Sequence, residues 1–243
     1  MKKLIKKSFS KIQWDYETNM DLTFKKVIFV FILFFISQIA IGTLVGVINK
    51  IFPSLNIDYM LLNIILNLLL ILAIPVIYSY KNFVLDFFGK NFISSKVIQS
   101  GIFYGFVAIF VNLIIGSLLF YLYSVLNLNP TQQQVVQLIE NTDNINPILV
   151  YFGIAISAPL AEELFFRGIV YRTFAKKISL RNGILFTSIL FSLLHFDLFY
   201  IPQIFLISIV FSLAYNETGS ILTPIIAHLI SNSLFIIPFL LSI

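Results

Sequence analysis

Long apolar runs are the feature that most restricts how this chain can fold. Seven such runs occur in the 243-residue sequence, at about 27–48, 60–80, 97–126, 147–170, 183–200, 202–215 and 221–243. A helix of about 20 apolar residues crosses the ~30 Å hydrocarbon core of a bilayer. Strand-like alternation does not recur, which excludes an outer-membrane barrel. The sequence therefore predicts an all-α polytopic transmembrane helical bundle of seven membrane helices, or eight if residues 83–95 form another.

Composition and charge agree with this class. The chain is 59% hydrophobic and 11% charged, whereas soluble domains contain about 25% charged residues. It has no cysteine, so thiol chemistry is excluded. Basic residues gather in the segments 1–26, 81–96 and 171–182, and the positive-inside rule then predicts a cytoplasmic N-terminus. We expect a basic cytoplasmic or interfacial tail over 1–26, followed by a single transmembrane domain over 27–243.

One apolar run contains three ionisable residues, Glu162, Glu163 and Arg167. Each costs at least about 2.5–3.5 kcal/mol at bilayer depth, so such residues indicate function or local pairing. Glu163 and Arg167 are four residues apart on one helical face, with the acid on the favourable N-terminal side. Glu162 lies about 100° around the helix. We therefore expect a structural ion pair between Glu163 and Arg167, and a Glu162 carboxylate that is available as a general base.

Both histidines of the chain, His195 and His228, also lie in apolar runs. His228 and Asn232 are four residues apart and share a helical face. With a rise of about 1.5 Å per residue, Glu162, His195 and His228 fall in the middle or cytoplasmic half of their predicted spans. This agreement in depth allows one shared pocket.

These side chains suit hydrolysis by an activated water molecule. Glu162 with His195 would activate the water, and His228 with Asn232 would stabilise the oxyanion. The alternative is a catalytic zinc held by Glu162, His195 and His228. The His-Glu-x-x-His motif of zinc proteases is absent from the sequence, so we prefer a glutamate mechanism without a cofactor, and zinc stays open as the alternative.

The order of these motifs resembles that of the CAAX protease and bacteriocin-processing family, also called CPBP or Abi, over about residues 145–235. The motifs are Glu162-Glu163-x-x-x-Arg167, Phe191-x-x-x-His195 and His228-x-x-x-Asn232. The resemblance implies a helical intramembrane endopeptidase with a cytoplasm-facing site that cleaves a membrane-associated peptide or protein. By matching motif positions it implies a catalytic Glu162 with partner His195, an oxyanion pair His228 and Asn232, and a supporting pair Glu163 and Arg167.

Two other functions remain open on the same residues. One is a non-catalytic bacteriocin self-immunity or partner-binding protein on this fold. The other is a proton-coupled transporter, although no internal inverted repeat is evident. A composition rich in Ile, Phe, Lys and Asn is typical of low-GC Gram-positive bacteria, so we expect the bacterial plasma membrane. The expected partners are a peptide or membrane-protein substrate and membrane lipid, with no nucleic acid.

Overall fold

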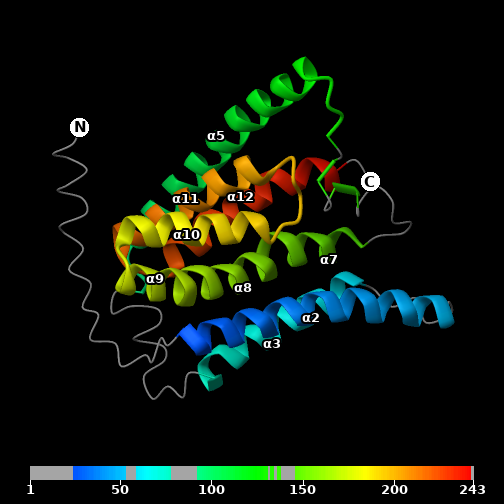
Figure 1. The fold of residues 1–243 in the computed structure, drawn as a ribbon, viewed down its shortest axis with the longest axis horizontal. Helices are drawn as coiled ribbons and strands as arrows, with labels where there is room; N and C mark the ends of the chain where they lie inside the picture. The colour runs from blue at the N-terminus through cyan, green and yellow to red at the C-terminus, as the bar shows by residue number, and fades with distance from the viewer. Residues whose placement is uncertain are drawn as a thin grey trace.

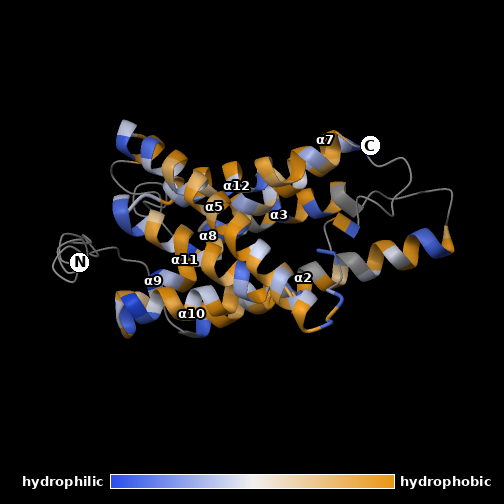
Figure 2. Cartoon of the chain, turned by 90° about the horizontal axis from the view of Figure 1, so that it is seen from above, coloured by the Kyte–Doolittle hydropathy of each residue, from blue (hydrophilic) through white to orange (hydrophobic). Residues whose placement is uncertain are grey.

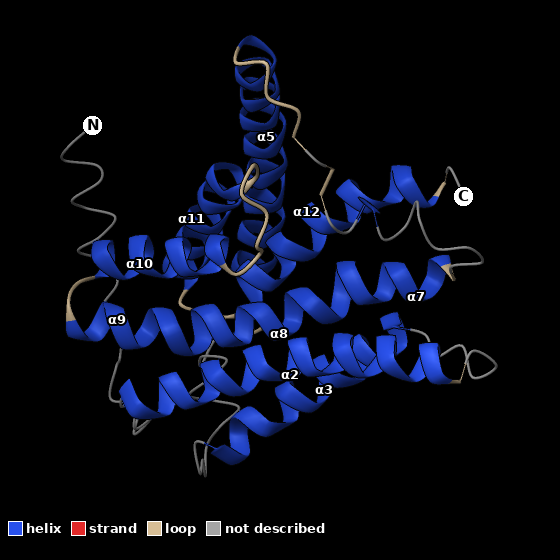
Figure 3. Cartoon of the chain, turned by 45° about the vertical axis from the view of Figure 1, so that its right-hand side comes forward, coloured by secondary structure: helices blue, strands red, loops and turns tan. Residues whose placement is uncertain are grey.

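The chain is described here by a computed structural model that covers residues 24–52, 59–77, 92–130, 132–133, 136–137 and 146–241. Most of these residues are helical, the others lie in turns and loops, and the described residues contain no strand (Figure 3). Two of the helices, η2 and η3, are π-helices. The elements are α2 (Phe24–Ile51), α3 (Tyr59–Ile77), α5 (Ser95–Val125), α7 (Pro147–Tyr151), η2 (Phe152–Ser157), α8 (Ala158–Phe165), η3 (Phe166–Tyr171), α9 (Arg172–Lys177), α10 (Leu180–Leu193), α11 (Ile201–Thr218) and α12 (Leu222–Leu240).

The all-α prediction is confirmed for the described part of the chain. Three of its helical stretches are long and apolar enough to cross a membrane, namely Ser95–Val125, Pro147–Lys177 and Leu222–Leu240. This finding supports an integral membrane protein, while seven or eight crossings and the side of the N-terminus stay predictions. Most of the predicted tail 1–26 and of the additional helix 83–95 lies outside the described residues.

The predicted span 183–200 is wrong at its C-terminal end. Helix α10 has 14 residues and stops at Leu193, and α11 begins only at Ile201. At 1.5 Å per residue α10 is about 21 Å long, which is short of the ~30 Å hydrocarbon core. The chain turns at Phe196, whose φ of 50° is left-handed. His195 therefore lies just beyond a helix end and not within a helix.

The stretch from α7 to α9 runs through the middle of the molecule (Figure 1). Helices α2 and α3 pair on one side of it, where α3 contacts α8 and η2. Helices α5, α10, α11 and α12 lie on the other side, with α5 packed against α11 and α12. Apolar residues cover most of the helix lengths, as Figure 2 shows.

Small residues allow α5 to approach α12 closely. A Cβ atom added at Gly101 would lie 2.7 Å from the Cβ of Ile226, and one at Gly105 would lie 2.9 Å from the Cβ of Ile230. Real Cβ atoms do not come so near, so glycine is required for this spacing. The contact matters for the site because α12 carries His228 and Asn232.

The central stretch changes its helical register on both sides of α8. In η2 the N–H of Ala158 bonds to the carbonyl of Gly153, five residues back. In the same register the next N–H would come from residue 159, and Pro159 has none. The carbonyl of Ile154 is therefore left without a helical donor. π-helical turns are rare in proteins, and those that occur often lie at functional sites. Here they flank the helix that carries Glu162 and Glu163.

Candidate active site

Glu163 lies at the centre of a buried polar cluster. Its Oε1 atom accepts hydrogen bonds from Arg167 NH1 at 2.8 Å and from His228 Nδ1 at 2.9 Å. The side chains of Glu163 and Arg167 are fully buried. The pair expected from the four-residue spacing is thus present, and the same carboxylate also binds an imidazole from α12. Glu163 consequently links the ion pair to His228.

Arg167 is held by groups far from it in the sequence. Its NH2 atom donates to the backbone carbonyl of Ser208 at 2.9 Å and to the hydroxyl of Ser208 at 2.7 Å. Its guanidinium also lies 4.9 Å from the ring centre of Phe191 and 5.5 Å from that of Phe211. Cation–π contacts of this kind gain strength when they are desolvated. Arg167 therefore joins the central stretch to both α10 and α11.

His228 is oriented by its Nδ1 atom. A carboxylate only accepts hydrogen bonds, so the contact with Glu163 places a proton on Nδ1. The ring stacks on Phe211, with centres 4.5 Å apart and planes at 26°. The other nitrogen, Nε2, lies 3.9 Å from Oε2 of Glu162. Glu162 is 23% exposed, so its carboxylate is open to a reactant beside the imidazole.

His195 is oriented in a similar way by a backbone carbonyl. Its Nδ1 atom lies 2.8 Å from the carbonyl oxygen of Phe191 and must donate to it. This carbonyl is available because α10 ends here, so the N–H of His195 bonds to Ser192 instead. The helix end thus fixes the ring and leaves Nε2 free of this contact.

Asn232 uses the carbonyl that the π-helical turn exposes. Its Nδ2 atom donates to the oxygen of Ile154 at 3.0 Å, the group that Pro159 leaves without a helical donor. The bond connects α12 to η2 and sets the plane of the amide. A second N–H of the same amide remains for another acceptor.

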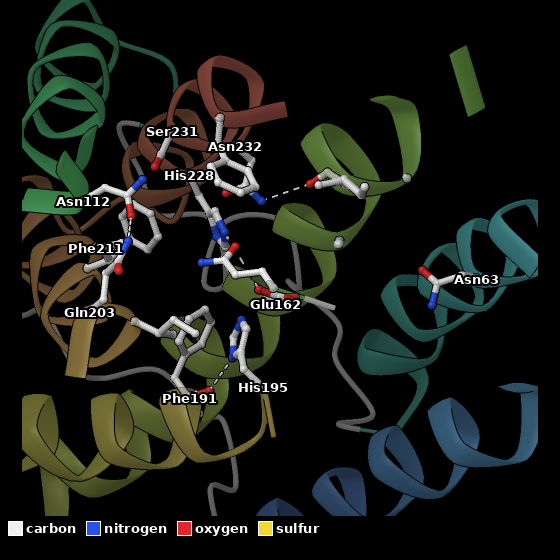
Figure 4. A pocket seen from close by; sticks show the side chains of 17 residues that line it. Asn63, Asn112, Glu162, Phe191, His195, Gln203, Phe211, His228, Ser231 and Asn232 are labelled. Carbon is white, nitrogen blue, oxygen red and sulfur yellow. Dashed lines mark hydrogen bonds and ion pairs between the residues drawn. The ribbon is translucent and has the colours of Figure 1, made fainter. Parts of the chain in front are cut away.

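All four residues predicted to be catalytic line one cavity. Glu162, His195, His228 and Asn232 surround a volume of about 550 Å³. Figure 4 shows His228 and Asn232 entering from α12, Glu162 from α8 and His195 from the turn after α10. A second cavity of about 330 Å³ shares Glu162 and His195 with the first. Side chains from distant helices therefore face a common space around Glu162.

The zinc alternative requires Glu162, His195 and His228 to bind one metal ion together. Among the residues that the structure describes, no three His, Asp or Glu side chains stand close enough together to hold a metal ion. Glu162 and His228 are neighbours, but the third ligand of the zinc alternative does not complete the set with them. The three ligands of the zinc alternative are thus not assembled among the described residues, and the choice between zinc and a glutamate mechanism stays a proposal.

Sequence reasoning missed several residues that shape the site. Ser208 and Phe211 support Arg167 and His228, and they carry no motif in the sequence. Phe191 stood in a motif only as the residue four positions before His195, yet it contacts Arg167 and both imidazoles. The amides Asn63, Asn112 and Gln203 line the cavity as well. For Ser208 and the three amides, a polar residue within an apolar run is the only signal in the sequence, and Phe211 carries no signal at all.

The fold and site define a class of protein: a helical membrane protein with carboxylate, imidazole and amide groups around a shared cavity. Within it, residues 144–234 match the family model described as type II CAAX prenyl endopeptidase Rce1-like. Over this segment, called the Rce1-like domain below, the chain is similar to that family, and the segment includes every residue of the candidate site from Glu162 to Asn232. No solved structure matches the chain at a comparable level of significance.

Curated relatives agree with this domain. The membrane-embedded CAAX protease MroQ of Staphylococcus aureus (strain USA300) is 33% identical over 97 residues, which cover 37% of this chain and 39% of MroQ. YdiL of Bacillus subtilis (strain 168), described as a candidate membrane peptidase, is 26% identical over 132 residues, or 54% of this chain and 52% of YdiL. An uncharacterized 24.3 kDa protein of Escherichia coli is 34% identical over 92 residues, or 36% of this chain and 42% of that protein.

The chain thus spans between 39% and 52% of the length of the curated relatives it matches. Together with the family model, these comparisons support a membrane peptidase.

Proposed function

We propose that this protein is an intramembrane endopeptidase that hydrolyses a peptide bond of a membrane-associated peptide or protein, by a glutamate mechanism that requires no metal. The observation that carries the proposal is the cavity shared by Glu162, His195, His228 and Asn232. The Rce1-like domain supports the reaction class, and the assignment of roles rests on the contacts of each side chain.

Glu162 is the general base in this proposal. It is partly exposed to the cavity, whereas Glu163 is fully buried and already bonded to Arg167 and His228. Only the first carboxylate is therefore free to take a proton from water. His195 lines the same cavity and presents Nε2 as a second acceptor, because its Nδ1 is engaged with Phe191.

His228 and Asn232 stabilise the oxyanion. His228 donates from Nε2 when both of its nitrogens carry protons, and Glu162 and Glu163 then balance its charge from 3.9 Å and 2.9 Å. Asn232 donates the N–H that is not bonded to Ile154. Preorganised donors of this kind account for a large share of catalysis in acyl transfer.

The reaction then proceeds in two steps. Glu162 removes a proton from water while the water oxygen attacks the scissile carbonyl carbon, and the negative charge moves to the carbonyl oxygen. The tetrahedral intermediate collapses, the C–N bond breaks, and the proton held by Glu162 passes to the leaving amine. The carboxylate is restored, and one water molecule has been consumed.

The test uses the full chain purified in detergent and a library of internally quenched peptides. We expect Glu162→Gln to lower kcat by about 10²–10⁴-fold, the usual contribution of a general base, with no change in melting temperature. Glu217→Gln is the matched control, because Glu217 bonds to Ser100 and lines neither cavity. Near-normal cleavage by Glu162→Gln would refute the assignment of the base.

A further inference from the structure

Two amide side chains form a bonded pair in the wall of the larger cavity. Asn112 of α5 and Gln203 of α11 both line it (Figure 4), and Nε2 of Gln203 donates to Oδ1 of Asn112. Gln203 is only 5% exposed. A Cβ atom at Gly116 would lie 3.5 Å from its amide, so the backbone of α5 also limits where that amide can move.

Gln203 has an unused acceptor. Its Oε1 atom is buried and has no hydrogen-bond partner among the described residues. A buried acceptor without a donor is costly, and such groups need an explanation in a native structure. Neither Gln203 nor Asn112 has a task in the proposed chemistry. A donor from a bound molecule would satisfy Oε1.

The remaining lining shows what kind of molecule fits. The ionisable side chains among the described residues around the larger cavity are Glu162, His195 and His228, and no lysine or arginine lines it. A negatively charged side chain in such a site would meet no lysine or arginine and would lie near the Glu162 carboxylate, so it would be disfavoured. An extended peptide presents unpaired backbone N–H groups, and each of these needs an acceptor away from water.

We propose that Gln203, held in place by Asn112, accepts a hydrogen bond from a backbone N–H of an extended peptide segment that carries no acidic side chain beside the scissile bond. This subsite rests on the proposed peptidase function and narrows its substrate class. It selects against peptides that carry an acidic side chain next to the cut, and it recognises the backbone, so that many other sequences are accepted.

The experiment combines a protein variant with a backbone change in the peptide. The probes are fluorescent, internally quenched decapeptides of uncharged residues, and versions in which one backbone amide at a time is N-methylated. Binding is measured by anisotropy and cleavage by fluorescence, with the full chain in detergent micelles. We expect Gln203→Met to weaken binding about tenfold, the usual size for one net hydrogen bond.

We also expect N-methylation at one position of the peptide to weaken binding to the wild type by about the same factor. In the Gln203→Met variant, the same N-methylation should cause no further loss of binding. A glutamate next to the cut should weaken binding to both proteins. Thr187→Val is the matched control, because it too removes a buried oxygen without a hydrogen-bond partner in the described chain, but lines neither cavity. If Gln203→Met does not fold, Asn112→Ala tests the same contact by removing the group that orients Gln203.

Each result separates the subsite from the peptidase function. Three results would overturn the subsite. Gln203→Met could leave binding unchanged, its loss could simply add to the loss caused by N-methylation, or the wild type could bind none of the peptides. Coupled losses combined with full cleavage by Glu162→Gln would overturn the catalytic proposal and leave the subsite standing.

Discussion

Replacing Arg167 by alanine should severely destabilise the protein. The substitution leaves the Glu163 carboxylate fully buried, with His228 as its remaining bonded partner. Breaking a buried ion pair by removal of one partner costs about 3–5 kcal/mol. The hydroxyl of Ser208 loses its donor as well, whereas the carbonyl of Ser208 keeps the Ser212 hydroxyl as a donor. An unsatisfied buried group costs about 1–3 kcal/mol. The sum is a large part of the ~5–15 kcal/mol that stabilises a typical protein.

The measurements are abundance in the membrane and melting temperature in detergent, with Arg167→Lys and Glu163→Gln/Arg167→Met beside Arg167→Ala. Lysine keeps the charge but lacks the planar fork that reaches both Glu163 and Ser208, so we expect an intermediate loss. The double variant removes both charges, and we expect it to be more stable than Arg167→Ala. It should still lose activity, because His228 no longer contacts a carboxylate at Nδ1.

Unchanged abundance and melting temperature in Arg167→Ala would refute the reasoning, since the cost follows directly from the burial and the three hydrogen bonds of the guanidinium. A double variant that is less stable than the single one would show that packing, and not the uncompensated charge, dominates.

Three further predictions concern packing, Asn232 and metal. Gly101→Ala should lower the free energy of unfolding, measured by melting, by about 1–3 kcal/mol through overpacking against Ile226. Gly46→Ala is the control and should not lose stability, because nothing lies within 4 Å of the added Cβ. Asn232→Ala should lower the rate of peptide cleavage. It should also lower the free energy of unfolding, measured by melting, by about 1–3 kcal/mol, because the Ile154 carbonyl loses its donor. Equal stability would show that the bond is dispensable. Cleavage should survive treatment with a zinc chelator, and stoichiometric zinc with chelator-sensitive activity would contradict the metal-free mechanism.

The amino-acid sequence determined those features that depend on neighbours along the chain. Apolar runs predicted the all-α class because a helix in a membrane satisfies its own backbone groups. The contact between Glu163 and Arg167 followed from their spacing, because residues four apart meet on any helix. The motif order also indicated the family whose model matches residues 144–234.

Only the tertiary structure decided how the helices face one another. Glu163 bonds to a histidine 65 residues away, and Arg167 bonds to a serine 41 residues away. Such contacts depend on the rotation and crossing of helices, which side chains from several elements set together. The early end of α10 likewise changed the surroundings of His195, because a helix end exposes a carbonyl that a continuous span would have bonded.

The cavity has the same origin. Glu162, His195, His228 and Asn232 come from α8, the turn after α10, and α12, and periodicity within each element says nothing of the space between them. Pro159 is visible in the sequence, but the carbonyl that it frees acquires a role only because α12 brings Asn232 within 3.0 Å of Ile154. Local chemistry thus supplied the groups, and the packing of α12 against η2 and α8 brought them to one site.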